Sequence, residues 1–270
     1  MSPANRVRLI VGVLALVAAG TVAGVVYATR QSPPQPEAQC KQRPTPFIVP
    51  GTPTANVAAV RAALAQKPVD AARQLEQLAF NAPKDPVVQF NYGTTLFCAG
   101  YVGEAEQAFH AAKLAGRDTF YEIQADAILH PQYFSKGYPP FQSASRDPLL
   151  VQGAILQRAG HEHSAERVWA KAARLHPESD EAQVAAAVGL FDMDNLSRSF
   201  SKLGPLVRRF PKSQSVRYHL GLLLAWTGQR DQAVTEFRLA RSLGPQTALG
   251  REANSFLGGL VTGGTKSTQR

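Results

Sequence analysis

Apolar and polar residues divide the chain into three stretches with different patterns. Residues 9–28, LIVGVLALVAAGTVAGVVYA, form an uncharged run of 20 residues. As a helix this run would be about 30 Å long, which matches the hydrocarbon core of a bilayer. Residues 31–51 contain six prolines, and proline prevents both regular helix and sheet. The remainder, from residue 52, is rich in alanine and leucine, which favours helices.

The charges beside the apolar run predict its orientation. Arg6 and Arg8 precede the run, and positive flanks stay on the cytoplasmic side. We therefore interpret residues 1–30 as a single-pass membrane anchor with a cytoplasmic N-terminus and the main domain outside the cytoplasm. The alternative is a cleaved signal peptide, because residues 26–28 have the small-residue spacing of a cleavage site. In that case the remainder would be secreted.

The proline-rich segment, residues 31–51, is predicted to be a linker. Such a segment favours extended polyproline II, which would reach up to ~65 Å at about 3.1 Å per residue. This linker would carry the main domain away from the membrane.

A pattern of small, aromatic and proline residues recurs with a 34-residue period. Two copies of the pattern are complete: Gly153, Ala165, Trp169, Ala172 and Pro177, then Gly221, Ala233, Phe237, Ala240 and Pro245. A third copy begins at Gly93 and lacks only the proline. This pattern resembles the tetratricopeptide-repeat (TPR) family. The small residues allow two helices to approach closely, and the aromatic residue fills the space between repeats.

The resemblance implies an all-α fold made of antiparallel helix pairs stacked into a right-handed solenoid, preceded by the one membrane helix. Phased repeats are expected at 52–85, 86–119, 146–179, 180–213 and 214–247. They give repeats 1–2 at 52–119 and repeats 3–5 at 146–247. Residues 248–270 are expected to supply a capping helix and a tail, since solenoids cover their open ends.

One repeat, at 120–145, is truncated. Its first helix is predicted within TFYEIQADAILH, residues 119–130, and the prolines that follow exclude a second regular helix. Four aromatic residues crowd into the rest: Tyr133, Phe134, Tyr138 and Phe141. Either these aromatics fill the gap left by the missing helix, or the segment is a binding loop or a joint between two sub-arrays.

The resemblance also implies which residues face the groove of the solenoid. The candidates for partner binding are Val87, Phe90, Phe97, Leu150, Arg158, Val184, Phe191, Tyr218, Leu222 and Trp226. A groove of this composition suits a partner helix or an apolar extended peptide. Phe90, Phe97, Tyr218 and Trp226 are the expected anchors. The alternative is that neighbouring repeats cover several of them.

Composition and motifs narrow the function. The formal charge of +9 is scattered along the chain, so no nucleic-acid partner is predicted. Cys40 and Cys98 are the only cysteines; they form one bridge in an oxidising compartment or stay as two unpaired thiols. No catalytic or nucleotide-binding motif occurs. The pair His161 and His163 lacks assured further metal ligands. We therefore predict no enzyme activity, no cofactor and no metal.

The layout resembles bacterial proteins with one membrane helix followed by exported repeats. It implies a membrane-anchored extracytoplasmic scaffold for protein–protein interactions in envelope assembly, folding or secretion. The alternative is a non-catalytic accessory subunit of an envelope enzyme or of cytochrome c maturation. Self-association stays open.

Overall fold

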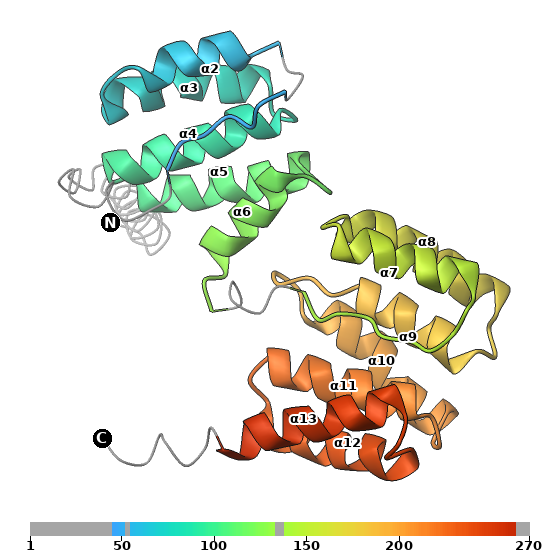
Figure 1. Cartoon of the computed structure of the whole chain (residues 1–270). Coiled ribbons are helices and arrows are strands. Elements are labelled where there is room, and N and C mark those ends of the chain that lie inside the picture. Colours follow the sequence, from blue (N-terminus) through green and yellow to red (C-terminus); the bar gives the residue numbers. More distant parts are fainter. Residues whose placement is uncertain (1–44, 52–54, 133–137, 263–270) are drawn as a thin grey trace, which may run out of the picture. The chain divides into compact units, whose positions relative to one another are not determined.

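The computed structural model describes residues 45–51, 55–132 and 138–262, and helices are the only regular elements within these ranges (Figure 1). The predicted all-α fold is thus confirmed for this part of the chain. None of the described helices is long and apolar enough to cross a bilayer. The predicted membrane span, residues 9–28, lies outside the described residues, as do Tyr133 and Phe134 of the truncated repeat.

The chain divides into two units, one ending at Ala108 and the other beginning at Phe109. The first unit holds α2 (Val57–Leu64), α3 (Pro68–Asn81), α4 (Pro86–Ala99) and the first half of α5 (Val102–Ala115). Within it, α2 packs on α3 and α4, and α3 packs on α4. The non-helical residues 45–50 contact α4 through Phe47.

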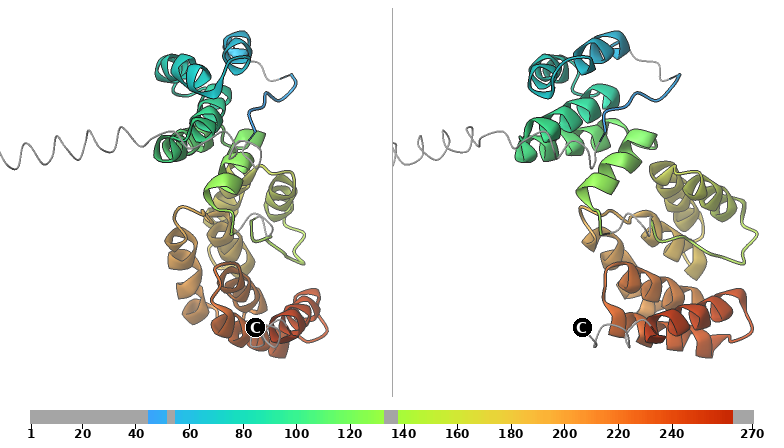
Figure 2. Two further views of the ribbon diagram at one scale, coloured as in Figure 1. Left: turned by 90° about the vertical axis from the view of Figure 1, so that its left-hand side faces the viewer. Right: turned by 60° about the vertical axis from the view of Figure 1, so that its left-hand side comes forward.

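The second unit continues with α6 (Phe120–Leu129) and three helix pairs. The pairs are α7 (Pro148–Arg158) with α8 (Glu162–Leu175), α9 (Asp180–Gly189) with α10 (Ser197–Arg209), and α11 (Gln214–Trp226) with α12 (Arg230–Leu243). A final helix, α13 (Ala248–Thr262), packs on α12 and α11. Consecutive pairs stack on one another (Figure 2). Because α9 contacts α11 and α11 contacts α13, we call the side of the unit lined by α7, α9, α11 and α13 the first-helix face.

Four first helices have the same kind of N-terminal cap. Asp85, Asp147, Ser179 and Ser213 precede α4, α7, α9 and α11, and each accepts hydrogen bonds from the first backbone N–H groups of its helix. Such caps satisfy donors that have no partner within the helix. With these caps, α4, α9 and α11 each begin at the first position of their repeat, and α7 begins two positions later.

The turn after α9 departs from this regularity. The matching turns after α4, α7 and α11 each contain a glycine with positive φ: Gly100, Gly160 and Gly228. The corresponding position after α9 is Asp194. The helix ends early, at Gly189, and α10 begins only at Ser197. The longer turn contains Asp192 and Asp194, which form ion pairs with other parts of the second unit.

Glycine and tryptophan residues explain the close packing of α7, α8 and α9. Trp169 of α8 is fully buried, and a Cβ atom at Gly153 of α7 would lie 2.1 Å from its Nε1 atom. A Cβ atom at Gly189 of α9 would lie 2.9 Å from the other side of the indole ring. The indole thus fills space that only glycine leaves open on both neighbouring helices. Gly221 of α11 and Phe237 of α12 repeat the contact between glycine and aromatic ring two pairs further on.

The truncated repeat keeps its first helix and replaces the second by extended chain. α6 lies within the predicted segment, and the described residues 139–147 contain no helix. Phe141, in the middle of this extended segment, is 4% exposed and belongs to the core of the second unit. The interpretation of the aromatics as a filling for the missing helix fits Phe141.

Cys98, near the end of α4, is disulfide-bonded. The alternative of two unpaired thiols is therefore wrong, although sequence spacing gave no means to decide it. Cys40 lies outside the described residues.

Candidate partner-binding site

Most of the predicted groove residues are covered by other parts of the chain. Seven of them are less than 9% exposed: Val87, Phe90, Leu150, Val184, Phe191, Tyr218 and Leu222. Phe97 and Trp226 are half-buried, and Arg158 is exposed. A buried side chain meets a partner only when the group that covers it moves away. The covering groups therefore decide what each unit can bind.

In the first unit, Phe90 is covered by an extended segment of the chain itself. The ring of Phe47 packs on the ring of Phe90, with centroids 4.7 Å apart. The next residue of α4, Asn91, is fully buried and donates a hydrogen bond of 2.8 Å from Nδ2 to the Phe47 carbonyl oxygen. Two side chains of α4 thus hold the segment 45–50. The ring of Phe90 packs on the ring of Phe47, and the amide of Asn91 binds the backbone of Phe47.

In the second unit, an amide of α7 pairs with the backbone of the extended segment. Gln157 accepts a hydrogen bond from the Phe141 N–H at 2.8 Å and donates one to the Pro139 carbonyl oxygen at 3.2 Å. In an extended chain the carbonyl of one residue and the N–H two residues later point to the same side. The Gln157 side chain therefore takes the place of a neighbouring strand. Pro140, between them, has no N–H to leave unpaired.

The phenyl ring of Phe141 occupies an aromatic site. Its centroid lies 5.2 Å from that of Trp169, in an edge-on arrangement, and 5.1 Å from that of His219, in a stacked one. Both partners are fully buried. Such contacts add specificity to the apolar burial.

His219 also binds the backbone of the segment. Its Nε2 atom lies 3.0 Å from the Gln142 N–H, which donates to it, so Nε2 carries no proton. The Nδ1 atom is 2.8 Å from the Ser215 carbonyl oxygen and therefore carries the proton. Burial lowers the pKa of His219 to about 4, which keeps the ring neutral. The neutral ring is the form that this pair of hydrogen bonds requires.

Tyr138 anchors the start of the segment. Its hydroxyl donates a hydrogen bond of 2.6 Å to Asp126 of α6, and its ring packs edge-on against Phe191 at 5.8 Å. Burial, together with the charge of Asp126, raises the pKa of Tyr138 far above its ordinary value. The hydroxyl therefore stays a donor at every physiological pH.

Open space flanks the segment on the first-helix face. A pocket of about 340 Å³ lies between Phe141–Ser143 and the α7 residues Leu150, Ala154 and Arg158. A second pocket, of about 280 Å³, lies between Gln142–Ala144 and the first turns of α9, α11 and α13. The extended segment thus fills part of this face and leaves room beside it.

A buried ion-pair cluster lies next to Tyr138. The ammonium group of Lys113 is 2.8 Å from Asp126 Oδ1, 2.6 Å from Asp194 Oδ2 and 3.3 Å from Asp192 Oδ1. Burial alone would lower the pKa of Lys113, but its hydrogen bonds to Asp126 and Asp194 and the nearby carboxylate charges raise it above its ordinary value. The cluster joins α5 to α6 and to the turn after α9 within the second unit.

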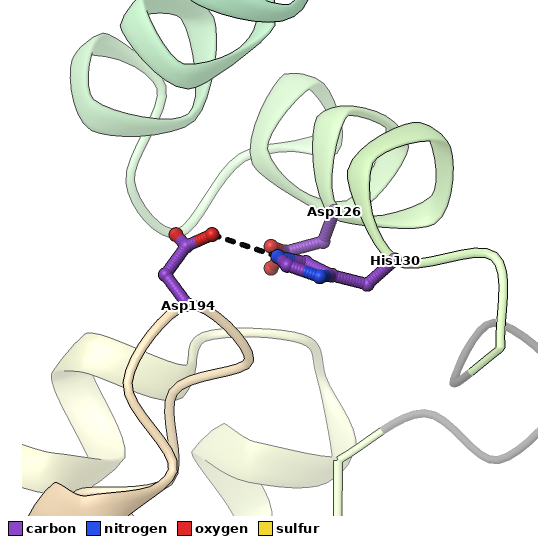
Figure 3. Close-up of side chains that lie close together, drawn as sticks. All are labelled: Asp126, His130 and Asp194. Carbon is purple, nitrogen blue, oxygen red and sulfur yellow. Dashed lines mark hydrogen bonds and ion pairs between the residues drawn. The ribbon is translucent and has the colours of Figure 1, made fainter.

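Part of this cluster has the composition of a metal site. Asp126, His130 and Asp194 offer ligand atoms within 4.8 Å of one another, and His130 Nε2 lies 2.7 Å from Asp194 Oδ1 (Figure 3). Lys113 already supplies a positive charge to both carboxylates. A metal ion there would have to displace a buried ammonium group, so we interpret the cluster as a structural ion pair.

The histidine pair singled out in the sequence has ion-pair and capping contacts as well. His163 Nε2 lies 2.6 Å from Glu122 Oε1, and Nδ1 lies 3.7 Å from Glu166. Hydrogen bonds with these two carboxylates raise the pKa of His163 to about 9. His161 contacts the Asp118 carbonyl oxygen. The pair thus connects α8 with α6 and the turn before it.

Among the residues that hold the extended segments, Gln157 stands at a repeat position that the resemblance assigns to the groove, but Asn91 and His219 were missed as candidates. A signal for them does exist in the sequence. Asn91 and His219 occupy the same position, the sixth, of repeats 86–119 and 214–247, and each is a polar residue inside an apolar helix. In addition, the dipeptide Pro–Phe occurs twice in the chain, at 46–47 and 140–141, and both copies dock on first helices.

Comparisons with known proteins give distant structural likenesses. No protein-family model and no curated protein matches the chain. Among solved structures, MamA from Desulfovibrio magneticus RS-1 is 17% identical, with a TM-score of 0.31, over 71% of this chain and 94% of that one. Yeast Tom70 is 14% identical, with a TM-score of 0.37, over 78% of this chain and 47% of that one. YrrB, described as a TPR protein with an unusual peptide-binding site, is 15% identical, with a TM-score of 0.33, over 68% and 99%.

At these identities and TM-scores the likenesses say nothing about what this chain binds. Its own helices define an α-helical repeat protein whose first helices hold extended segments. The helix pairs carry the 34-residue pattern by which the sequence resembles the tetratricopeptide repeats, with glycine in the first helix against an aromatic residue in the second.

Proposed function

We propose that the chain is a membrane-anchored, extracytoplasmic TPR scaffold that binds other proteins. The observation that carries this proposal is the way both units hold extended chain. In each unit, side-chain hydrogen bonds from a first helix engage the peptide backbone while aromatic rings pack on a phenylalanine. These are general means of binding a protein segment in extended form.

Two observations support a location outside the cytoplasm. Cys98 is disulfide-bonded, and such bonds persist in oxidising compartments. The uncharged run at 9–28, preceded by Arg6 and Arg8, predicts export of everything that follows.

Location is tested by alkylation in intact cells of the host. A membrane-impermeant maleimide should label the chain only after a reducing agent has been added, because the cysteine thiols are then both outside the membrane and released from their bond. Labelling that needs cell lysis would contradict the exported location. The chain has one other cysteine, Cys40, so a Cys40→Ser variant shows whether that residue is the partner of Cys98.

Binding is tested by crosslinking the full-length chain in host membranes and identifying the captured proteins. We expect a reproducible set of envelope proteins that is lost when the exposed side of the first-helix face is changed by Arg158→Glu. Lys171→Glu, on the exposed side of α8, is the matched control and should leave capture intact. A captured set identical in both variants and in an unrelated anchored protein would contradict the scaffold. A captured enzyme would make the chain its accessory subunit.

A further inference from the structure

We propose that the first-helix face of the second unit carries a specific site for an extended Pro–Phe segment, which residues 139–142 occupy in cis and which a partner's Pro–Phe segment takes over by exchange. This inference rests on the proposed scaffold function and adds the chemistry of the partner.

The contacts of the segment define what the site recognises. Gln157 pairs with the carbonyl of Pro139 and the N–H of Phe141, and His219 accepts the N–H of Gln142. All three bonds go to backbone groups, so any extended peptide can make them. Pro140 lies between the two residues that Gln157 contacts. No hydrogen bond is needed from the backbone nitrogen at this position, so proline, which has no N–H, fits there.

Side-chain selection comes from the ring of Phe141. It lies between the edge of Trp169 and the face of His219, in a site whose walls are fully buried. Smaller side chains would leave a cavity there, and a charged one would be desolvated without a partner. The site therefore selects an aromatic residue directly after the proline.

The first unit gives independent support. Its α4 holds the only other Pro–Phe dipeptide of the chain, Pro46–Phe47, through the same two kinds of contact. Phe47 packs on Phe90, and its carbonyl accepts from Asn91. Two unrelated segments of one chain with the same dipeptide dock on first helices in two different units. This repetition points to recognition of the dipeptide rather than to a single accidental contact.

The site has room for a longer ligand. Open pockets of about 340 and 280 Å³ lie beside the bound segment. A partner that carries Pro–Phe within a longer extended region could add contacts there. Those contacts would offset the advantage of the tethered segment, whose effective concentration is on the order of millimolar.

The test uses the full-length protein in detergent and a labelled synthetic peptide, GYPPFQSAS, copied from residues 137–145. Phe141→Ala should weaken the cis segment and open the site, so this variant should bind the peptide at least tenfold more tightly than the unaltered protein. The matched control peptide, GYPPAQSAS, should bind neither. Adding Gln157→Ala to the Phe141→Ala variant should weaken peptide binding at least tenfold.

A Phe141→Ala variant that keeps its helical circular dichroism and binds no peptide would overturn the proposal and leave the segment a permanent filling of the fold. Should that variant not fold, hydrogen exchange in the unaltered protein decides. Excess peptide should accelerate exchange of the Phe141 and Gln142 amides, which are protected by Gln157 and His219. Unchanged protection at saturating peptide would overturn the proposal equally.

The two proposals fail separately. Envelope proteins captured by crosslinking that an excess of GYPPFQSAS does not displace would refute Pro–Phe recognition while the scaffold stands. Specific peptide binding without any captured protein would refute the scaffold while the site stands.

Discussion

Lys113 is the residue whose loss should most clearly weaken the second unit. Its ammonium group and the carboxylate of Asp126 are 9% and 4% exposed, and two further carboxylates, Asp192 and Asp194, share the same charge. The substitution Lys113→Met keeps the length of the side chain and removes its charge. Asp126 would then be buried without a cation, whereas Asp192 keeps its ion pair with Arg198 and Asp194 keeps its contact with His130.

The size of the effect follows from the burial of each partner. Removing one member of a buried ion pair costs about 3–5 kcal/mol, because the other charge is left uncompensated. Asp192 and Asp194 are 25% and 31% exposed, so they can regain hydration. Asp126 is too deeply buried to regain hydration, and its carboxylate would keep only the hydrogen bond that the Tyr138 hydroxyl donates. We expect a loss near the lower limit, about 3 kcal/mol, or roughly 6–12 °C in Tm.

Urea unfolding followed by tryptophan fluorescence measures this unit selectively, since Trp169 and Trp226 are the only tryptophans of the chain and both lie in the second unit. Lys171→Met, in the exposed part of α8, is the matched control and should stay within about 0.5 kcal/mol of the unaltered protein. A Lys113→Met variant as stable as this control would refute the account of a buried cluster.

The pH dependence gives a second check on the cluster. Burial alone would raise the pKa of Asp192 and Asp194, but Lys113 and hydrogen bonds lower it below the ordinary value. Their stabilising contribution is therefore present above the unfolded pKa, about 3.9, and is lost as the pH falls below it. The difference between the unaltered protein and Lys113→Met should narrow below about pH 4. A difference that stays constant down to pH 3 would contradict the argument.

Two further predictions use the same fluorescence assay. Gly153→Ala places a Cβ atom 2.1 Å from the indole of Trp169 and should destabilise the second unit by at least ~2 kcal/mol through overpacking. Gly258→Ala, where a Cβ atom meets open space, should be neutral or slightly stabilising. Equal Tm values for the two variants would contradict the role of Gly153. For His219, burial lowers the pKa from 6.5 to about 4, so its contribution is complete above pH 6.5 and is lost as the pH falls toward 4. Glu162, whose pKa burial raises to about 8, titrates in the opposite sense in the same range, so the comparison is between the unaltered protein and His219→Gln. Their difference in unfolding free energy should shrink between pH 6.5 and 4.5, and a constant difference would show that His219 does not need to be neutral.

Helix pairing could be read from the sequence because its determinants are local. The glycine, aromatic and proline positions of one repeat lie within about 25 residues, and each encodes one packing contact. Gly153 and Trp169, 16 residues apart, meet as the pattern predicts. The truncated repeat was equally visible, because three prolines cannot continue a helix.

The candidate site could be predicted only in part. The positional rule of the repeats selects Phe90 and Leu150 but does not say what already lies on them. The residues that hold the covering segments act across distances outside the repeat period. Asn91 and Phe47 are 44 positions apart, and His219 and Gln142 are 77 apart. Lys113 and Asp194, 81 positions apart, are likewise joined by tertiary structure alone. No periodic pattern carries such pairings.

The position of Lys113 bears on how the protein can be cut. Counted by sequence, repeats 1–2 end at residue 119, and a fragment beginning at residue 120 would contain the truncated repeat and all three that follow. Such a fragment lacks Lys113 and would leave the buried carboxylate of Asp126 without its cation. Half of α5 therefore belongs to the repeats that come after it. Fragments for expression should begin before this helix. Chimeras with other repeat proteins should keep α5 and the turn after α9 from the same parent protein.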